Sequence, residues 1–179
     1  GGRCAFTNET VPKRLRIESA KGPQRVVDFA LGGDHSAFKV EDGTWYITGR
    51  NDKGQLGTGD YEHRCLPQKL LGKVRMPANG IQADTPVTHV ALGREHSAFV
   101  LDGKAYVMGD NEHGQLGLGD KGMKKYEPSE LDPGTGKRAT YLAAGAEQTA
   151  FVADTTFTAS VTNSPTPSQT PTSTSTPSA

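Results

Sequence analysis

Cysteine is scarce in this chain of 179 residues, which holds only Cys4 and Cys65. Two thiols are too few for a disulfide framework or a zinc site; they form either a single Cys4–Cys65 bridge or two unrelated thiols. No apolar run is long enough to cross a bilayer, so no membrane span is expected. Neither sign of charge is in excess, because 20 Lys and Arg balance 20 Asp and Glu. This balance argues against nucleic acid as a partner of this segment.

An internal repeat organises the body of the chain. Residues 26–60 and 87–120 share the strings ALG, HSAF and GQLG-x-GD, at an offset of about 60 residues. A third copy, over residues 140–154, reads TYLAAGAEQTAFVAD and lacks the GQLG part. The string Pro-x-x-Leu follows GQLG in both full copies and also occurs at residues 12–15, which indicates the tail of a preceding repeat. A fixed period of this kind is typical of a repeat architecture.

Each copy is predicted to form about four strands and no helix. The strings HSAFKV and HSAFVL are short, bounded by glycine and rich in strand formers. Asp102-Gly103 separates two apolar runs and predicts a two-residue hairpin with positive φ at both positions. The Pro-x-x-Leu segments predict a short outer strand, since an edge strand tolerates proline. Four-stranded units repeated in this way are the blades of a propeller.

The fold class is therefore all-β: a partial β-propeller with about two full repeats, two partial ones and a disordered tail. Such a short body cannot close a ring of blades, so the remaining blades are expected from a longer chain or from another copy. The segments are residues 1–25 (tail of a preceding repeat and basic connector), 26–86 (repeat), 87–139 (repeat), 140–154 (start of a further repeat) and 155–179 (Ser/Thr/Pro-rich disordered tail).

The repeat resembles a known family. Strings such as ALGREHSAFVLDGKAYVMGDNEHGQLGLGD are similar to the regulator-of-chromosome-condensation repeat, in which Asn-x-x-Gly-Gln-Leu-Gly follows an aromatic strand that ends in glycine. The resemblance implies a propeller of about seven blades that serves as a protein-binding platform. It also implies a link to small GTPases, because the founding member is a guanine-nucleotide exchange factor for one.

Several repeated residues are interpreted as structural. Adjacent residues on a strand point to opposite faces, so His35 and Ser36, or His96 and Ser97, cannot readily form a hydrolytic pair. The third copy has Gln148 at the histidine position, and glutamine cannot serve as a general base. We therefore expect these histidines to bridge backbone groups between strands, and the glycines to supply turns with positive φ. The structural positions are His35, His96, Gly49, Gly109, Gly54, Gly57, Gly114 and Gly117.

No cofactor, metal or catalytic residue is predicted. The GQLG strings lack the Gly-Lys-Ser/Thr ending of a phosphate loop, and the carboxylates near Asn51 and Asn111 do not have the spacing of a calcium loop. The predicted partner-facing residues lie in the loops before the His strands, because equivalent loops gather on one face of a propeller. They are Asp34, Arg94, Glu95 and Glu147.

Two functions remain open. One is a non-catalytic protein-interaction scaffold, which includes a guanine-nucleotide exchange factor or regulator of a small GTPase as a special case. The alternative is an extracellular or cell-surface recognition or inhibitor module on an O-glycosylated stalk, because residues 164–178 are Ser, Thr and Pro apart from Gln169. The low cysteine content and the resemblance favour the cytoplasm, whereas the tail favours a secreted or cell-surface location.

Overall fold

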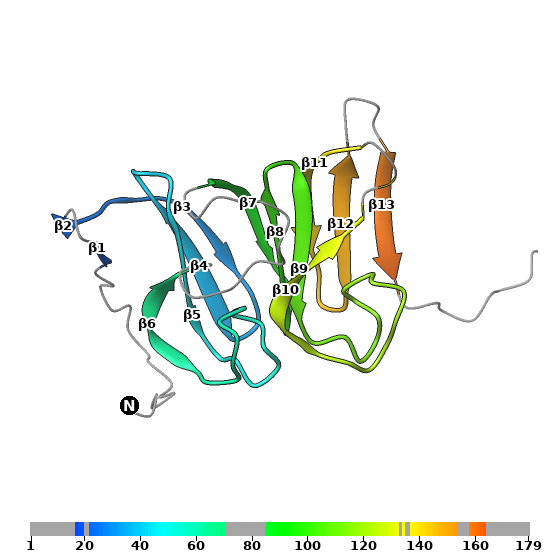
Figure 1. Cartoon of the computed structure of the whole chain (residues 1–179). Helices are drawn as coiled ribbons and strands as arrows, with labels where there is room; N and C mark the ends of the chain where they lie inside the picture. The colour runs from blue at the N-terminus through cyan, green and yellow to red at the C-terminus, as the bar shows by residue number, and fades with distance from the viewer. Residues whose placement is uncertain are drawn as a thin grey trace, which may run out of the picture.

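Every regular element in the described part of the chain is a β-strand. The computed structural model describes residues 17–19, 22–70, 85–132, 134, 137–153 and 158–163. Three antiparallel sheets stand side by side in chain order (Figure 1). The first holds β3 (Val26–Leu31), β4 (His35–Val40), β5 (Trp45–Gly49) and β6 (Arg64–Lys69). The second holds β7 (Val87–Leu92), β8 (His96–Leu101), β9 (Lys104–Gly109) and β10 (Lys125–Leu131).

The third sheet has three described strands, β11 (Ala139–Ala144), β12 (Gln148–Ala153) and β13 (Thr158–Asn163). A short ribbon of β1 (Glu18–Ser19) and β2 (Gly22–Pro23) precedes the first sheet. The all-β, propeller-type prediction is confirmed. No helix among the described residues is long and apolar enough to cross a membrane.

Turn chemistry and strand alternation account for the sheets. Asp102 and Gly103 have φ values of 50° and 72°, as a two-residue hairpin between β8 and β9 requires. The corresponding turn in the first sheet is one residue longer and carries Gly43 at φ 85°. The Pro-x-x-Leu segments that begin at Pro67 and Pro128 contribute to the outer strands β6 and β10, as predicted. The segment at residues 12–15 lies outside the described residues.

The predicted start of the disordered tail, at residue 155, is wrong. Thr158–Asn163 lies within the predicted tail of residues 155–179, but it forms β13 and pairs with all of β12. This stretch, TASVTN, contains β-branched Thr and Val, which favour a pleated sheet. Residues 164–179, which hold the Ser/Thr/Pro-rich stretch, and residues 1–16 of the predicted preceding repeat lie outside the described residues.

Two hydrophobic clusters join the three sheets. The first contains Trp45 and Ile47 from the first sheet with Leu92, Phe99 and Tyr106 from the second. The second cluster fills the space between the second and third sheets. It contains Ala91, Ala98, Val100, Val107, Leu142 and Phe151, among others.

Each sheet is therefore buried against its neighbour, and the first strands β3, β7 and β11 contact one another in turn. This is the arrangement expected for blades whose inner strands converge on a common axis.

Cys65 on β6 is disulfide-bonded. The sequence holds one other cysteine, Cys4, which lies outside the described residues. For Cys65, the alternative of a free, unrelated thiol is therefore wrong.

Candidate interaction surface

The loops before the His strands are fixed to the loops that follow the return strands. His35 lies opposite Gly49, and His96 lies opposite Gly109. The backbone N–H of Arg50 donates to the backbone carbonyl of Asp34 at 2.9 Å. Gly49 has φ 120°, and an added Cβ there would approach the Asp34 carbonyl oxygen to 2.5 Å. Only glycine fits this close approach, so Asp34 and the loop after Gly49 are held together at one end of the sheet.

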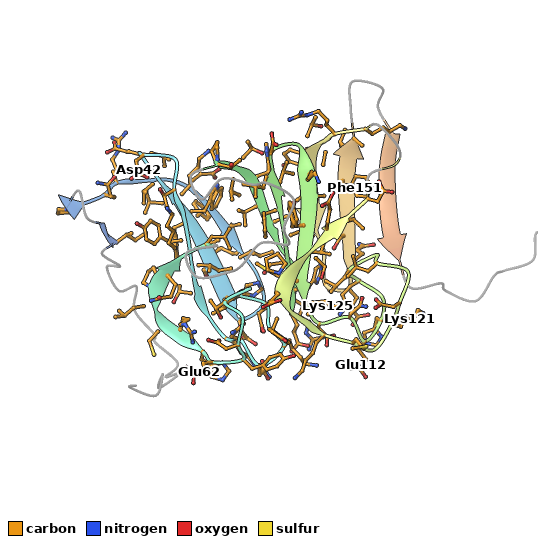
Figure 2. The ribbon with its side chains drawn as sticks, viewed as in Figure 1. Asp42, Glu62, Glu112, Lys121, Lys125 and Phe151 are labelled. Carbon is orange, nitrogen blue, oxygen red and sulfur yellow. The ribbon has the colours of Figure 1, made fainter. Side chains whose placement is uncertain are left out.

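The equivalent positions of the second sheet have the same geometry. The Asp110 N–H donates to the carbonyl of Glu95 at 2.9 Å, and Gly109 has φ 107°. Figure 2 shows Glu62, Glu112 and Lys121 on the loops at this end of the sheets and Asp42 at the opposite end. This loop end carries the candidate surface.

In each Asn-x-x-Gly-Gln-Leu-Gly segment, the asparagine side chain is hydrogen-bonded to the backbone of its own loop. Asn51 Oδ1 accepts from the Leu56 N–H at 2.8 Å, and its Nδ2 donates to the Asp60 carbonyl at 2.9 Å. Asn111 makes the same bonds to Leu116 and Asp120. The four glycines of these segments all take positive φ. They are Gly54 (84°), Gly57 (60°), Gly114 (81°) and Gly117 (67°).

A hydrogen-bonded relay crosses from the first sheet to the second. His35 Nε2 lies 2.8 Å from Ser97 Oγ, and Ser97 Oγ donates to the Gln55 carbonyl at 2.6 Å. Because the single hydroxyl hydrogen of Ser97 is used on Gln55, the N–H of His35 donates to Ser97. The relay therefore begins and ends in the first sheet and passes through the second.

The same relay joins the second and third sheets. His96 Nε2 lies 3.0 Å from Thr149 Oγ1, which donates to the Gln115 carbonyl at 2.8 Å. Burial lowers the pKa of both His35 and His96 to about 4, so both rings are neutral at neutral pH. The described contact of each histidine ring is with a hydroxyl group of the next sheet, and that hydroxyl group donates to a backbone carbonyl.

The relay does not have the geometry of nucleophilic catalysis. His35 donates to Ser97, whereas a general base must accept the hydroxyl proton. Ser97 and Thr149 are also completely buried, so no substrate reaches them. Among the described residues, no group of His, Cys, Asp and Glu is arranged to hold a metal ion.

A charged cluster spans the first and second sheets at the loop end. The Arg50 guanidinium lies 2.6 Å from Asp52, 3.3 Å from Asp34 and 3.6 Å from Glu95. The hydrogen bond that Arg50 donates to Asp52 raises the pKa of Arg50. Although burial opposes it, the hydrogen bond from Arg50 holds the pKa of Asp52 below its usual value. Arg50 therefore holds three carboxylates from both sheets together.

Lys53 extends this cluster along the boundary between the sheets. Its Nζ lies 3.1 Å from Asp110 and 3.9 Å from Glu95, and the hydrogen bond to Asp110 raises the pKa of Lys53. The charged cluster, defined as Asp34, Asp52, Glu95, Asp110, Arg50 and Lys53, thus has four acids and two bases.

The remaining predicted loop residues lie at the same end. Glu147 Oε1 is 4.0 Å from His113 Nε2 of the second sheet, and Arg94 is exposed. The structure thus brings Asp34 and Glu95 together through Arg50 and pairs Glu147 with a different loop. Sequence reasoning missed four members of the cluster, although all of them lie within four residues of the glycine that ends a return strand. They are Arg50, Asp52, Lys53 and Asp110.

A match to a protein-family model shows which family this chain belongs to. The model described as the regulator of chromosome condensation (RCC1) repeat matches residues 42–100 and 102–152, more than half of the chain. The chain belongs to the RCC1 repeat family. Each RCC1 match begins in the hairpin between the second and third strands of one sheet. It ends in the second strand of the next sheet. The sequence repeat therefore straddles two blades.

Curated relatives agree with this assignment. The chain is 36% identical over 117 residues to a protein RCC2 homolog of Xenopus laevis. It is 33% identical over 130 residues to the ultraviolet-B receptor UVR8 of Arabidopsis thaliana, and 32% over 172 residues to the X-linked retinitis pigmentosa GTPase regulator of Homo sapiens. The matches cover 63%, 72% and 73% of this chain but only 20%, 27% and 17% of the relatives. The chain thus spans about a quarter or less of their length.

Solved structures share the fold. Human WBSCR16 is 26% identical, with a TM-score of 0.63 over 84% of this chain and 36% of its own. Prp20p of Saccharomyces cerevisiae, described together with its binding properties to Gsp1p and histones, is 22% identical. Its TM-score is 0.62, over 88% of this chain and 35% of its own. At that identity, the likeness to Prp20p shows the fold alone.

Proposed function

We propose that this chain is part of a non-catalytic β-propeller scaffold that binds a protein partner through the loop end of its sheets. The charged cluster carries the proposal. Loops from two successive sheets are fixed there by Gly49 and Gly109, and the cluster has more acidic than basic groups. Charged groups held on a rigid surface set the specificity and rate of association. A partner with a basic contact surface fits this arrangement.

The finer proposal is that the partner is a small GTPase, on which the scaffold acts as a regulator or exchange factor. The support is the name of the human relative, a GTPase regulator, together with the binding of Prp20p to Gsp1p. Exchange of this kind needs no covalent chemistry, because surface contact displaces the nucleotide. The relatives give no support to the extracellular recognition module.

Release of a fluorescent nucleotide from a panel of small GTPases tests the finer proposal. The chain, and a longer protein that contains it if one exists, should accelerate release from at least one member. If neither accelerates release from any GTPase, the exchange activity is excluded. Binding without acceleration would retain the scaffold and remove only the exchange step.

A charge-reversal pair tests the loop end itself. Asp34 and Glu147 have side chains that are more than half exposed, whereas Glu95 is largely covered. We therefore expect Asp34→Lys with Glu147→Lys to weaken partner binding strongly. The matched control is Glu41→Lys, which removes an exposed pair with Arg25 at the opposite end of the first sheet. Equal binding by the double variant and the control would place the contact elsewhere.

A further inference from the structure

Two exposed tyrosines meet at the boundary between the first and second sheets. Tyr61 follows the GQLG segment of the first sheet, and Tyr126 lies in β10, next to Lys125, at the loop end (Figure 2). Their ring centroids are 5.3 Å apart, with one ring edge-on to the other. Tyr61 is 40% exposed, Tyr126 is 42% exposed, and Met123 in the loop before β10 is 67% exposed. Exposed apolar side chains grouped in this way mark an interaction site.

Backbone contacts between the two sheets fix the position of Tyr126. The N–H of Gly59 donates to the carbonyl of Tyr126 at 3.1 Å. A Cβ added to Gly54, which has φ 84°, would approach Tyr126 Cα to 2.5 Å, so this close approach requires glycine. The loop of the first sheet and the start of β10 are therefore held together before any ligand binds, which lowers the entropic cost of binding.

One of the two rings already carries a cation. The Lys124 ammonium lies 4.3 Å from the ring centroid of Tyr61, and its Nζ also donates to the backbone carbonyl of Asp52 at 3.0 Å. Among the described residues, no lysine or arginine lies over the ring of Tyr126. The pair of rings is therefore a place where a cation binds, and one ring of the pair is vacant.

A carboxylate lies beside the vacant ring. Adjacent side chains on a regular strand point to opposite faces, but the register of β10 shifts between Lys125 and Ser129. As a result, Tyr126 contacts Tyr61, while Glu127 Oε1 lies 4.0 Å from the Cβ position of Gly59, two residues before Tyr61. Glu127 is exposed and forms no salt bridge with a described residue. Both side chains thus lie against the same loop.

We propose that this surface binds an arginine of a partner protein, with an apolar residue of the same segment against Met123. We call Tyr61, Met123, Tyr126 and Glu127 the tyrosine surface. A guanidinium is planar, so it can stack on the Tyr126 ring and pair with the Glu127 carboxylate. The unpaired negative charge selects a cationic ligand, and tyrosine and arginine are both enriched among the residues that dominate binding energy.

This inference rests on the proposed protein-binding function and names a second part of its contact. Lys124 joins the two parts, because it lies over Tyr61 and is hydrogen-bonded to Asp52 of the charged cluster. A partner with a basic surface at the loop end therefore reaches the tyrosine surface as well. The charged cluster supplies complementary charge there, and the tyrosine surface supplies the apolar contact.

A pair of short peptides tests the proposal. The isotope-labelled chain is titrated with acetyl-Leu-Arg-Leu-amide and with acetyl-Leu-citrulline-Leu-amide, in which an uncharged urea replaces the guanidinium, and NMR spectra follow the binding. The arginine peptide should shift the signals of Met123, Tyr126 and Glu127 and bind about fivefold more tightly than the citrulline peptide. Equal affinities would show an apolar contact alone and would overturn the proposal, as would the absence of shifts at these residues.

Two variants and a matched control locate the site. Tyr126→Leu removes the aromatic face but keeps an apolar side chain against Tyr61, and Glu127→Gln removes only the charge. Each should reduce the preference for the arginine peptide, and circular dichroism checks that each is folded. The control is Tyr141→Leu on the inner strand β11, which changes a tyrosine that is 54% exposed and has its own aromatic neighbour, His89. A preference that survives both surface variants, or that the control abolishes, would refute the assignment.

The peptide titration is independent of the natural partner. Its failure would remove the arginine site and leave the scaffold proposal standing. The charge reversal of Asp34 and Glu147 tests that proposal separately, because neither residue belongs to the tyrosine surface.

Discussion

The side chain of His35 in the first sheet is hydrogen-bonded at 2.8 Å to Ser97 in the second, and the pair recurs one repeat later as His96 and Thr149. The hydroxyl group of Ser97 or Thr149 in turn donates a hydrogen bond to the backbone carbonyl of a glutamine that follows the return strand of the preceding sheet. Neighbouring sheets are therefore joined by a buried polar relay as well as by apolar packing. Buried polar groups are costly to leave unpaired, so the relay favours one alignment of adjacent sheets.

Removal of the hydroxyl in the relay should destabilise the fold. Ser97→Ala leaves the His35 N–H and the Gln55 carbonyl buried without this partner, and we expect a loss of about 2 kcal/mol in the free energy of unfolding. Urea denaturation measures it. The matched control is Ser36→Ala, at the equivalent but half-buried position. A loss as large in the control as in Ser97→Ala would contradict the relay.

Stability should fall as the pH falls below neutrality. The pKa of His35 and of His96 is lowered to about 4 in the folded chain, whereas the unfolded histidines have the ordinary value of about 6.5. The unfolded state therefore binds more protons between these two pH values. The contribution of each histidine is fully present above the unfolded pKa and is lost as the pH drops toward 4, by up to about 3 kcal/mol each.

Glutamine in place of the two histidines should flatten this pH dependence. The third copy already has Gln148 at this position, so His35→Gln with His96→Gln preserves the donor but does not titrate. Thermal melts of the variant and the wild type from pH 7 to pH 4 measure the difference. Parallel pH profiles for the two proteins would show that other groups control acid stability.

An added methyl group at the inner loop should disrupt the contact between sheets. In Gly93→Ala the new Cβ would meet the ring of His96 and approach the Gly145 carbonyl oxygen to 2.6 Å. Overpacking of this kind costs about 2 kcal/mol. The control is Gly119→Ala, where nothing lies within 4 Å and only the positive φ of 80° is unfavourable, for about 1 kcal/mol. The reverse order of stabilities would refute this interpretation.

Arg50 should stabilise the boundary between the first two sheets in a salt-dependent way. Arg50→Ala leaves Asp34, Asp52 and Glu95 close together without their shared cation, and we expect a loss of about 1 kcal/mol at low salt. High salt should shrink this loss, because it screens both the lost attraction and the new repulsion. Arg138→Ala, which removes an exposed pair with Asp102, serves as the control and should change little. An effect of Arg50→Ala that is independent of salt would indicate a packing role.

Strands and hairpins could be predicted from the sequence because their signals are short-range. Asp102-Gly103 favours a two-residue hairpin, because these residue types tolerate the positive φ that the turn requires. The alternation in HSAFVL assigns each side chain to one face of its strand. The offset between His35 and His96 likewise established the repeat and, with the GQLG strings, the family. β13 was missed because TASVTN adjoins a Ser/Thr/Pro-rich stretch and lacks the repeat motif.

By itself, then, the sequence determined the repeat, the strand order within each blade and the residues that a turn demands. Only the tertiary structure decided that His35 bonds to Ser97, that Arg50 joins carboxylates from two sheets, and that Tyr61 meets Tyr126. The reason is physical: turns and pleats depend on neighbours within a few residues, whereas these contacts depend on how one sheet stacks on the next. That stacking brings together residues about 60 positions apart, and no local pattern records which face meets which.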